Sequence, residues 1–394
     1  MMQAITLNLN CISEALLRYR NFIDSCEDIH VKFRLTPRAD TSAYALCFAI
    51  FGYRLLQATD IIDRHRELWD QQLRAGLSEK QFERSKVASL SQDKPYLQLL
   101  TFTLSALSIL GTLNNDPLAK EIEVLLPVDI EKALLDSKAL NGVARSGNQA
   151  MFLGILLIYA RDHLGLEVQN DIDHWVNLHL RTMNSFGFWG VSETMSHLHF
   201  QNGYHQYELL EYLNADNVPW GAAADAVAAL ADADGHFAPY PGGGGCYDYD
   251  AVFILTATEK TTARHHELLM QTAHSILNEQ NADGGYCESQ RVRPRTLANV
   301  SRSLVHAFNG RGRARTERLR SALTLLRTKH DRIHTHWSVY SREWGESDLW
   351  DSWFRMLTLA RIDCALNPER AKDWGFINFP GIGFHSSLRK NIAS

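Results

Sequence analysis

Apolar side chains recur along the chain with the period of an α-helix. In the first such segment Tyr44, Phe48, Phe51 and Leu55 fall at positions i, i+4, i+7 and i+11, which places them on one helix face. Several segments are apolar nearly all round, and a helix without a polar face must be surrounded by other helices. Segments of this kind, predicted as inner helices, lie at 42–56, 96–110, 148–161, 204–213, 249–258, 297–308 and 350–362. More amphipathic segments, predicted as outer helices, lie between them at 171–182, 265–279 and 316–328.

A short glycine-containing motif repeats three times in the C-terminal half. Residues 184–189 (NSFGFW), 232–237 (DADGHF) and 281–286 (NADGGY) each run from Asn or Asp through a glycine to an aromatic residue. Their starts lie roughly 50 residues apart, a spacing typical of helical repeats. We expect the glycines to allow turns with positive φ and the aromatic side chains to fill gaps between helices. Residues 329–337 (KHDRIHTHW) are interpreted as a fourth, degenerate copy.

These two patterns together predict an all-α protein, a closed α/α toroid (barrel) of about six to seven helical hairpins. Its inner helices are expected to be buried and its outer helices amphipathic, with the glycine-aromatic turns joining one pair to the next. No extended alternating pattern indicates β-strands, and no proline-rich linker divides the chain. We therefore expect a single toroid domain over 1–394, with 1–40 as an N-terminal helical extension and 366–394 as a C-terminal tail.

The charge balance argues against a nucleic-acid-binding protein. The 394 residues are 45% hydrophobic and 22% charged, and 40 basic against 45 acidic side chains give a net charge of −5. A nucleic-acid-binding surface is usually strongly basic. One basic run, 311–320 (RGRARTERLR), departs from this balance. We interpret it as the solvated face of an outer helix, with an anionic partner as the alternative.

Apolar runs and cysteines place the chain among cytoplasmic proteins. The longest apolar run, 150–160, is about half the length that a membrane-spanning helix needs, so no membrane span is expected. The N-terminus carries no visible secretory signal. Six scattered cysteines without a CxxC pair then indicate reduced thiols rather than a disulfide scaffold.

The glycine-containing repeat resembles the QW motif of the terpenoid cyclase and protein prenyltransferase superfamily, which is built on α/α toroids. That motif ends in Gln-x-x-x-Gly-x-aromatic, and 280–286 (QNADGGY) matches it with Tyr286 in place of Trp. The other two copies hold Met183 and Ala231 where the motif has Gln. The resemblance covers the C-terminal half, from about 170 to 364, and implies the toroid fold.

The segment 243–255 (GGGCYDYDAVFIL) carries two further resemblances. It is similar to the glycine-cysteine-tyrosine helix start of prenyltransferase β subunits, in which the Cys binds zinc, and this implies Cys246 as a zinc ligand. It also resembles the DxDD motif of class II terpene cyclases, with Asp248 and Asp250 at the first and middle carboxylates and Ala251 at the last. The middle Asp of that family is the general acid that protonates an alkene, which implies this role for Asp250.

A toroid brings the N-terminal ends of its inner helices together around one end of a central cavity. Side chains at those ends therefore form the predicted site, although they lie far apart in sequence. The predicted catalytic residues are Asp250, Asp248, His205, Tyr204 and Glu208. The predicted substrate-binding residues are Arg145, Asn148, His199, Asn202, Tyr247, Arg293, Arg295, Trp350 and Asp351.

Each catalytic assignment has a structural alternative. Asp250 is predicted as the proton donor, with Asp248 as a neighbouring carboxylate whose repulsion raises its pKa. His205 and Tyr204 are predicted as a second acid–base pair, oriented by Glu208. The two Asp residues could instead cap the helix start, and His205 and Glu208 could form a structural i, i+3 pair.

Three functions stay open on the sequence alone. The leading hypothesis is an isomerase or lyase that cyclises or isomerises an isoprenoid-like small molecule by protonating it. A carbohydrate lyase or hydrolase acting on an acidic sugar is the second, because toroid enzymes of this class use Tyr, His, Asn and Arg. This chain offers Tyr204, His205, Asn148 and Arg293, with the arginine neutralising the sugar carboxylate. The third is a toroid that binds a small molecule or a protein without catalysis. No cofactor is predicted, and zinc and magnesium are kept as alternatives. The expected partner is a small molecule, which carries an anionic group if the arginines bind it.

Overall fold

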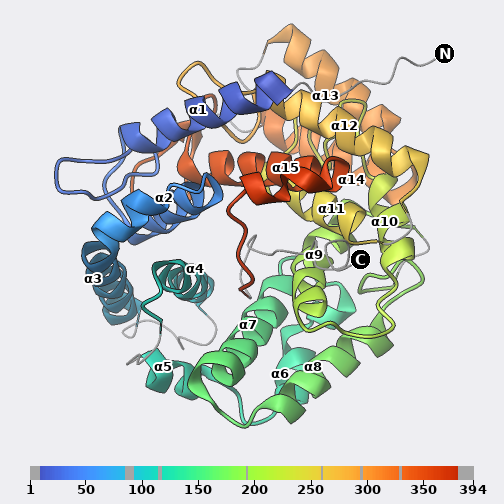
Figure 1. The fold of residues 1–394 in the computed structure, drawn as a ribbon. Helices are drawn as coiled ribbons and strands as arrows, with labels where there is room; N and C mark the ends of the chain where they lie inside the picture. The colour runs from blue at the N-terminus through green and yellow to red at the C-terminus, as the bar shows by residue number, and fades with distance from the viewer. Residues whose placement is uncertain are drawn as a thin grey trace.

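Helices make up the structure and form a closed ring. The computed structural model describes residues 9–84, 93–113, 118–191, 194–258, 261–292, 296–327 and 331–379. Within them the inner ring consists of α2 (Ala43–Leu55), α4 (Lys94–Leu110), α7 (Gly147–Leu164), α9 (His197–Tyr212), α11 (Gly245–Ala257) and α15 (Leu349–Leu366). Each of these helices packs against the next and α15 packs against α2, so the ring closes (Figure 1). The predicted all-α toroid is thereby confirmed.

The remaining helices lie around this ring. They are α1 (Leu9–Ser25), α3 (Thr59–Arg84), α5 (Leu118–Leu125), α6 (Ile130–Ser137), α8 (Gln169–Thr182), α10 (Trp220–Ala228), α12 (Ala263–Asn278), α13 (Leu297–Asn309) and α14 (Gly312–Arg327). Short 3-10 helices cover Ala139–Asn141 and Pro368–Asp373, and strands β1 (Arg332–Ile333) and β2 (Arg342–Glu343) pair antiparallel. None of the described helices is long and apolar enough to cross a membrane.

Burial separates the inner helices from the outer ones. In α2, 11 of 13 residues are buried, and in α15, 15 of 18, whereas α14 buries only Ala314, Arg318 and Ala322. A helix enclosed on all sides needs no polar face, which explains the nearly continuous apolar runs of the inner helices. Hydroxyl or carboxylate side chains cap the starts of α2, α9 and α15 by accepting backbone N–H groups. These caps stabilise the helix starts at the end of the ring where the predicted site lies.

All three glycine-containing repeats form the same turn. In each, the backbone N–H of the first residue donates to the carbonyl group four residues later, from Asn184, Asp232 and Asn281. The glycine at the fourth position has φ values of 80°, 81° and 90°, a region that side chains disfavour. The aromatic residue that ends each repeat is buried. The repeats are therefore equivalent turns, as predicted.

The prediction that 297–308 forms an inner helix is wrong. The third repeat turn is instead hydrogen-bonded to the start of α15, which comes later in the chain. The Tyr286 carbonyl accepts from Asp348 N–H, and the Tyr286 N–H donates to Ser352. α15 thus takes the place beside α11, and α13 forms a hairpin with α14 outside the inner ring. Helical periodicity reveals an apolar stripe on a segment, but it does not tell whether that stripe faces the core.

The predicted fourth repeat, 329–337, forms no such turn in its described part. Residues 329 and 330 lie outside the described residues, and Arg332–Ile333 forms β1. The segment 331–347 then places Trp337 against Trp350 at the start of α15. This segment therefore covers the end of the ring at which the inner helices begin.

Both ends of the described chain pack on the ring. Helix α1 contacts α2, α12 and α15. After α15 the chain descends toward the centre of the ring (Figure 1), where Gly375 N–H donates to the Leu55 carbonyl and Phe379 packs against His163 of α7. Residues 380–394 lie outside the described residues. The predicted division into one domain, an extension and a tail stays a prediction.

Candidate active site

A buried cluster of two carboxyl groups and one imidazole lies between α9 and α11. His205 and Glu208 are about one turn apart on α9, and Asp250 faces them from α11. His205 Nδ1 is 3.6 Å from Asp250 Oδ1 and 3.9 Å from Glu208 Oε2. All three side chains are buried, so solvent screens their interactions only weakly. The structure thus brings three of the predicted catalytic residues together.

Asp250 binds its proton more tightly than an ordinary aspartate. Burial, the charge of Glu208 and a hydrogen bond with Glu208 raise the pKa of Asp250 well above its usual range. Among the described residues, His205 is the one basic side chain within 4.0 Å of the Asp250 carboxyl group. The repulsion comes from Glu208 rather than from Asp248, because residues two apart on a helix point in different directions.

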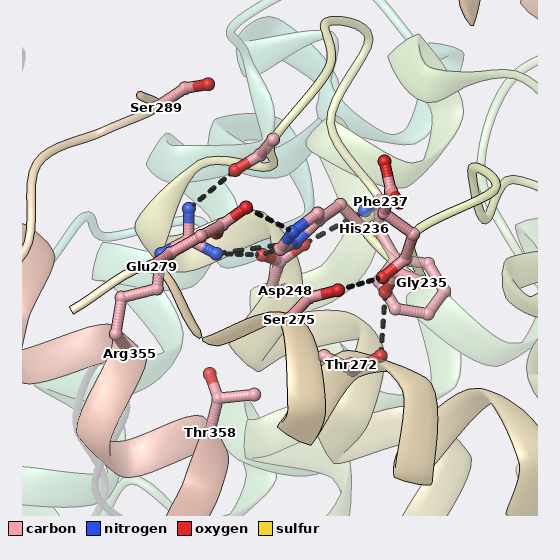
Figure 2. Close-up of polar contacts among 12 residues, drawn as sticks. Gly235, His236, Phe237, Asp248, Thr272, Ser275, Glu279, Ser289, Arg355 and Thr358 are labelled. Carbon is pink, nitrogen blue, oxygen red and sulfur yellow. Dashed lines mark hydrogen bonds and ion pairs between the residues drawn. The ribbon is translucent and has the colours of Figure 1, made fainter. Parts of the chain in front are cut away.

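Asp248 belongs to a separate buried cluster (Figure 2). Its carboxylate accepts hydrogen bonds from His236 Nδ1 at 2.8 Å, from the Phe237 N–H at 2.9 Å and from Arg355. Glu279 contacts the other ring nitrogen of His236 at 3.3 Å. Burial by itself raises the pKa of Asp248, but the positive charges of His236 and Arg355 hold this pKa below its usual value. Asp248 thus joins the second repeat turn to α11 and α15, and its catalytic role stays a prediction.

A cleft with about 150 Å³ of free space opens where α11 and α15 begin. Trp337 and Trp350 stack in its wall, with their ring centroids 4.4 Å apart. The predicted binding residues Tyr247, Trp350 and Asp351 line it, together with Cys246. The cleft is therefore partly aromatic, and it contains three of the predicted binding residues.

Cys246 lies between this cleft and the buried cluster. It precedes Asp250 by four residues on α11, so the two side chains share a helix face, about 6 Å apart along the axis. The Tyr204 hydroxyl is 3.8 Å from Cys246 Sγ, and the Tyr204 ring lies 4.1 Å from the His205 ring between centroids. Cys246 lines the cleft and Tyr204 contacts it from outside the lining, and the pair is called the cleft floor below. Asp250 is not among the lining residues.

Carboxyl groups outnumber cations in the described lining of the cleft. Arg342 already contacts two carboxylates, Asp348 at 2.5 Å and Asp351 at 2.7 Å. Burial and the neighbouring Asp348 raise the pKa of Asp351 to about 7. Glu288 accepts a hydrogen bond from the Tyr240 hydroxyl at 2.6 Å, and burial raises its pKa as well. This lining suits hydroxyl groups of a ligand better than a free anion.

Two predicted binding residues hold neighbouring backbone in place. Asn202 donates to the Val143 carbonyl at 2.6 Å, which ties the start of α9 to the chain before α7. His199 Nδ1 lies 2.9 Å from the hydroxyl of Ser196, the cap of the same helix. Both side chains are buried. These contacts give both residues a structural task, and their binding roles stay predictions.

The predicted anion-binding residues do not form one described group. Arg145 is exposed and Asn148 half-buried near the start of α7. Arg293 and Arg295 lie outside the described residues. Of the three predicted arginines the structure describes Arg145 alone, and the anion-binding role of all three stays a prediction.

Sequence reasoning missed several cleft residues that lie outside the helices, among them Tyr240, Glu288, Trp337 and Arg342. Tyr240 follows the second repeat turn and Glu288 follows the third, so their position directly after a turn was a usable signal. Arg342 and Trp337 belong to the segment 331–347, whose course over the ring no motif indicates. Long-range packing alone brings these two residues to the cleft.

His205, Glu208 and Asp250 are also the one group of three potential metal ligands found in the described part of the chain. Two carboxylates and an imidazole are ligand types that divalent transition metals accept. Cys246 is not a member of this group. Burial raises the pKa of its thiol, which disfavours the thiolate that zinc binds. Zinc binding by Cys246 stays a prediction.

No protein-family model matches the chain, and no curated protein matches it in sequence. Among solved structures, the type II terpene cyclase MstE from Scytonema in its apo form is similar over 91% of this chain and 99% of its own, with a TM-score of 0.50 and 12% identity. The chain has the fold of a type II terpene cyclase. Its resemblance to the terpenoid cyclase superfamily is thus confirmed at the level of the fold.

Two further solved structures are similar to this chain. A variant of MstE in complex with its substrate, geranylgeranyl dihydroxybenzoate, has a TM-score of 0.49 and 11% identity, covering 91% of this chain and 98% of its own. A protein from Actinoplanes has a TM-score of 0.46 and 14% identity, covering 89% of this chain and 99% of its own.

Proposed function

We propose that this protein is an enzyme that cyclises an isoprenoid-like small molecule, and that Asp250 donates the proton that starts the reaction. The observation that carries the proposal is the buried Asp250 carboxyl group, whose pKa burial and Glu208 raise well above the usual range. Protonating an alkene requires an acid that is still protonated near neutral pH. MstE, whose fold is similar, is a type II terpene cyclase.

The proton transfer leaves a carboxylate that the cluster can accommodate. Asp250 gives its proton to one alkene carbon, and the neighbouring carbon becomes a carbocation. His205, with Nδ1 3.6 Å from Asp250 Oδ1, then stabilises the new carboxylate. A second double bond of the substrate attacks the cation, which closes a ring and moves the positive charge to another carbon. Loss of a proton from the carbon next to that charge, to a water molecule, forms a double bond and ends the sequence. The product is therefore an isomer of the substrate.

The aromatic wall of the cleft stabilises the carbocation after ring closure, when the positive charge has moved from the carbon beside Asp250 toward the cleft. The stacked Trp337 and Trp350 and the nearby Tyr247 line the cleft above the acid. The faces of aromatic rings attract cations, with Trp the strongest of the three types.

The substrate has to reach Asp250 past the cleft floor. Cys246 and Tyr204 contact each other at 3.8 Å between the cleft and the cluster. We therefore expect the alkene end of the chain to displace this contact and the polar end to stay in the cleft. There Glu288, the Asp351 carboxyl group and the Tyr240 hydroxyl favour a hydroxyl-bearing head group.

Product analysis with matched variants tests the proposal. The purified protein is incubated with geranylgeranyl diphosphate and with geranylgeranyl dihydroxybenzoate, the substrate of MstE, and products are separated by chromatography and mass spectrometry. We expect a cyclic product with the mass of its substrate, absent with Asp250→Asn and retained with Asp216→Asn, an exposed carboxylate outside the site. Consumption of acidic oligosaccharides, or turnover by Asp250→Asn, would contradict the proposal.

A further inference from the structure

The hairpin of α13 and α14 carries an apolar stripe that faces solvent. Leu297, Leu304 and Phe308 of α13 fall at i, i+7 and i+11, so they lie on one helix face. Their exposed fractions are 89%, 42% and 60%, and Val305 beside them is 59% exposed. Single exposed apolar residues are normal in proteins, but an aligned set of them indicates a surface that meets an apolar partner.

This stripe is not needed to complete the ring. The buried residues of α13 are Ser303, His306 and Ala307, none of which belongs to the stripe. Figure 1 shows α13 and α14 outside the ring that α15 closes against α2. The apolar face of α13 therefore has no partner within the described chain.

Arginines make the same hairpin strongly cationic. Residues 296–327 contain seven arginines and one carboxylate, a net charge of +6 (7 − 1) in a chain whose total is −5. Arg313, Arg320 and Arg327 fall at i, i+7 and i+14 and are exposed along the solvent face of α14. The single carboxylate, Glu317, turns toward the ring, where it accepts a hydrogen bond from His197 N–H at 2.7 Å.

We propose that the α13–α14 hairpin docks on the surface of an anionic lipid membrane. The hairpin combines an exposed apolar face on α13 with an exposed arginine row on α14, and apolar and basic faces together are the composition of helices that lie in the plane of a membrane interface. The apolar stripe enters the acyl boundary, and the arginines contact phosphate groups of the lipids. A nucleic acid offers phosphates as well, but its backbone has no apolar layer for Leu304 and Phe308.

Flotation with lipid vesicles tests this proposal on the full chain. Vesicles of phosphatidylcholine alone are compared with vesicles that also contain phosphatidylglycerol. We expect the protein to float with the anionic vesicles and to be released by added salt. Replacing Arg313, Arg320 and Arg327 by Gln lowers the partition coefficient about 100-fold, since each basic side chain near an anionic surface contributes about fivefold.

Two double variants isolate the apolar stripe. Leu304→Ser with Phe308→Ser should lower vesicle partitioning at least about tenfold. Val124→Ser with Val128→Ser, which changes two exposed apolar residues outside the hairpin, should leave it unchanged. All substituted residues are exposed, so melting temperatures should stay at the wild-type value, and circular dichroism checks this.

Three results would overturn the proposal. The first is equal recovery of the wild type with and without phosphatidylglycerol. The second is equal loss of partitioning with the Val124→Ser, Val128→Ser control. The third is binding of a double-stranded DNA oligonucleotide that the arginine variant loses and the Leu304→Ser, Phe308→Ser variant keeps, which would assign the surface to nucleic acid.

Discussion

Replacing Asp248 by Asn should destabilise the protein strongly, because it removes the shared partner of two buried cations. The side chains of Asp248, His236 and Arg355 are almost completely buried, and Asp248 accepts from both (Figure 2). Removing one member of a buried ion pair typically costs about 3–5 kcal/mol. The raised pKa of His236 gives a similar free energy for the loss. Although burial lowers it, Asp248 and Glu279 raise it from 6.5 to about 10, which corresponds to about 5 kcal/mol shared between the two carboxylates.

The pH dependence of this loss follows from the direction of the His236 shift. A folded-state pKa above the unfolded value stabilises the fold fully below about pH 6.5, and this contribution is lost as pH rises through about 10. The effect of Asp248→Asn should therefore be largest near pH 6 and smaller near pH 10. Part of it persists at pH 10, because Arg355 stays charged.

Thermal and urea unfolding at the two pH values measure the effect. With about 2 cal/mol/K of unfolding entropy per residue over 394 residues, a loss of 3–5 kcal/mol lowers Tm by about 4–6 °C. Asp234→Asn is the control, because its half-exposed pair with Arg291 should contribute less than about 1 kcal/mol. An Asp248→Asn protein with wild-type stability at pH 6 would refute the reasoning.

Three other predictions concern the acid, the aromatic wall and the repeat turns. Because the pKa of buried Asp250 is raised, this residue lowers the stability of the fold as pH rises above about 4. In urea titrations from pH 4 to 9, the stability of Asp250→Asn should therefore fall less with pH than that of the wild type. Trp337→Ala should lower kcat about 30-fold, since a desolvated cation–π contact contributes about 2 kcal/mol, and Trp337→Phe should recover most of the loss; equal rates for both variants would exclude the cation role. Gly284→Ala should lower the free energy of unfolding by more than about 2 kcal/mol, because its φ is 90° and a Cβ would meet the Arg18 carbonyl. Gly221→Ala is the control and should not destabilise the protein, because Gly221 lies in a helix where a Cβ would meet no other atom.

The fold was accessible from the sequence because its repeat is local. Within each glycine-containing turn, all the hydrogen bonds that define it lie within five residues, so the motif predicts the turn. The same sequence could not place 297–308, since the choice between α13 and α15 depends on contacts of Tyr286 with Asp348 and Ser352, more than 60 residues away. Local patterns therefore predict that an element forms, but not which other elements it packs against.

The candidate site was accessible only in part. The structure brings the predicted residues Asp250, His205 and Glu208 together, although His205 and Glu208 lie well inside α9 rather than at its start, and their catalytic roles stay predictions. The sequence did not reveal that Asp248 points to His236 and Arg355, because the direction of a side chain depends on helix rotation. The cleft residues of the segment 331–347 have no local signature at all, since tertiary packing alone brings them over the ring.

Deuterium incorporation tests the central claim most directly. The enzyme is incubated with the accepted geranylgeranyl substrate in D₂O, and the product is analysed by mass spectrometry and NMR. If Asp250, exchanged with solvent, protonates the alkene, each product molecule gains one deuterium at the protonated carbon, and Asp250→Asn forms no product. A product without deuterium, or one that Asp250→Asn still labels at the wild-type rate, would contradict the account.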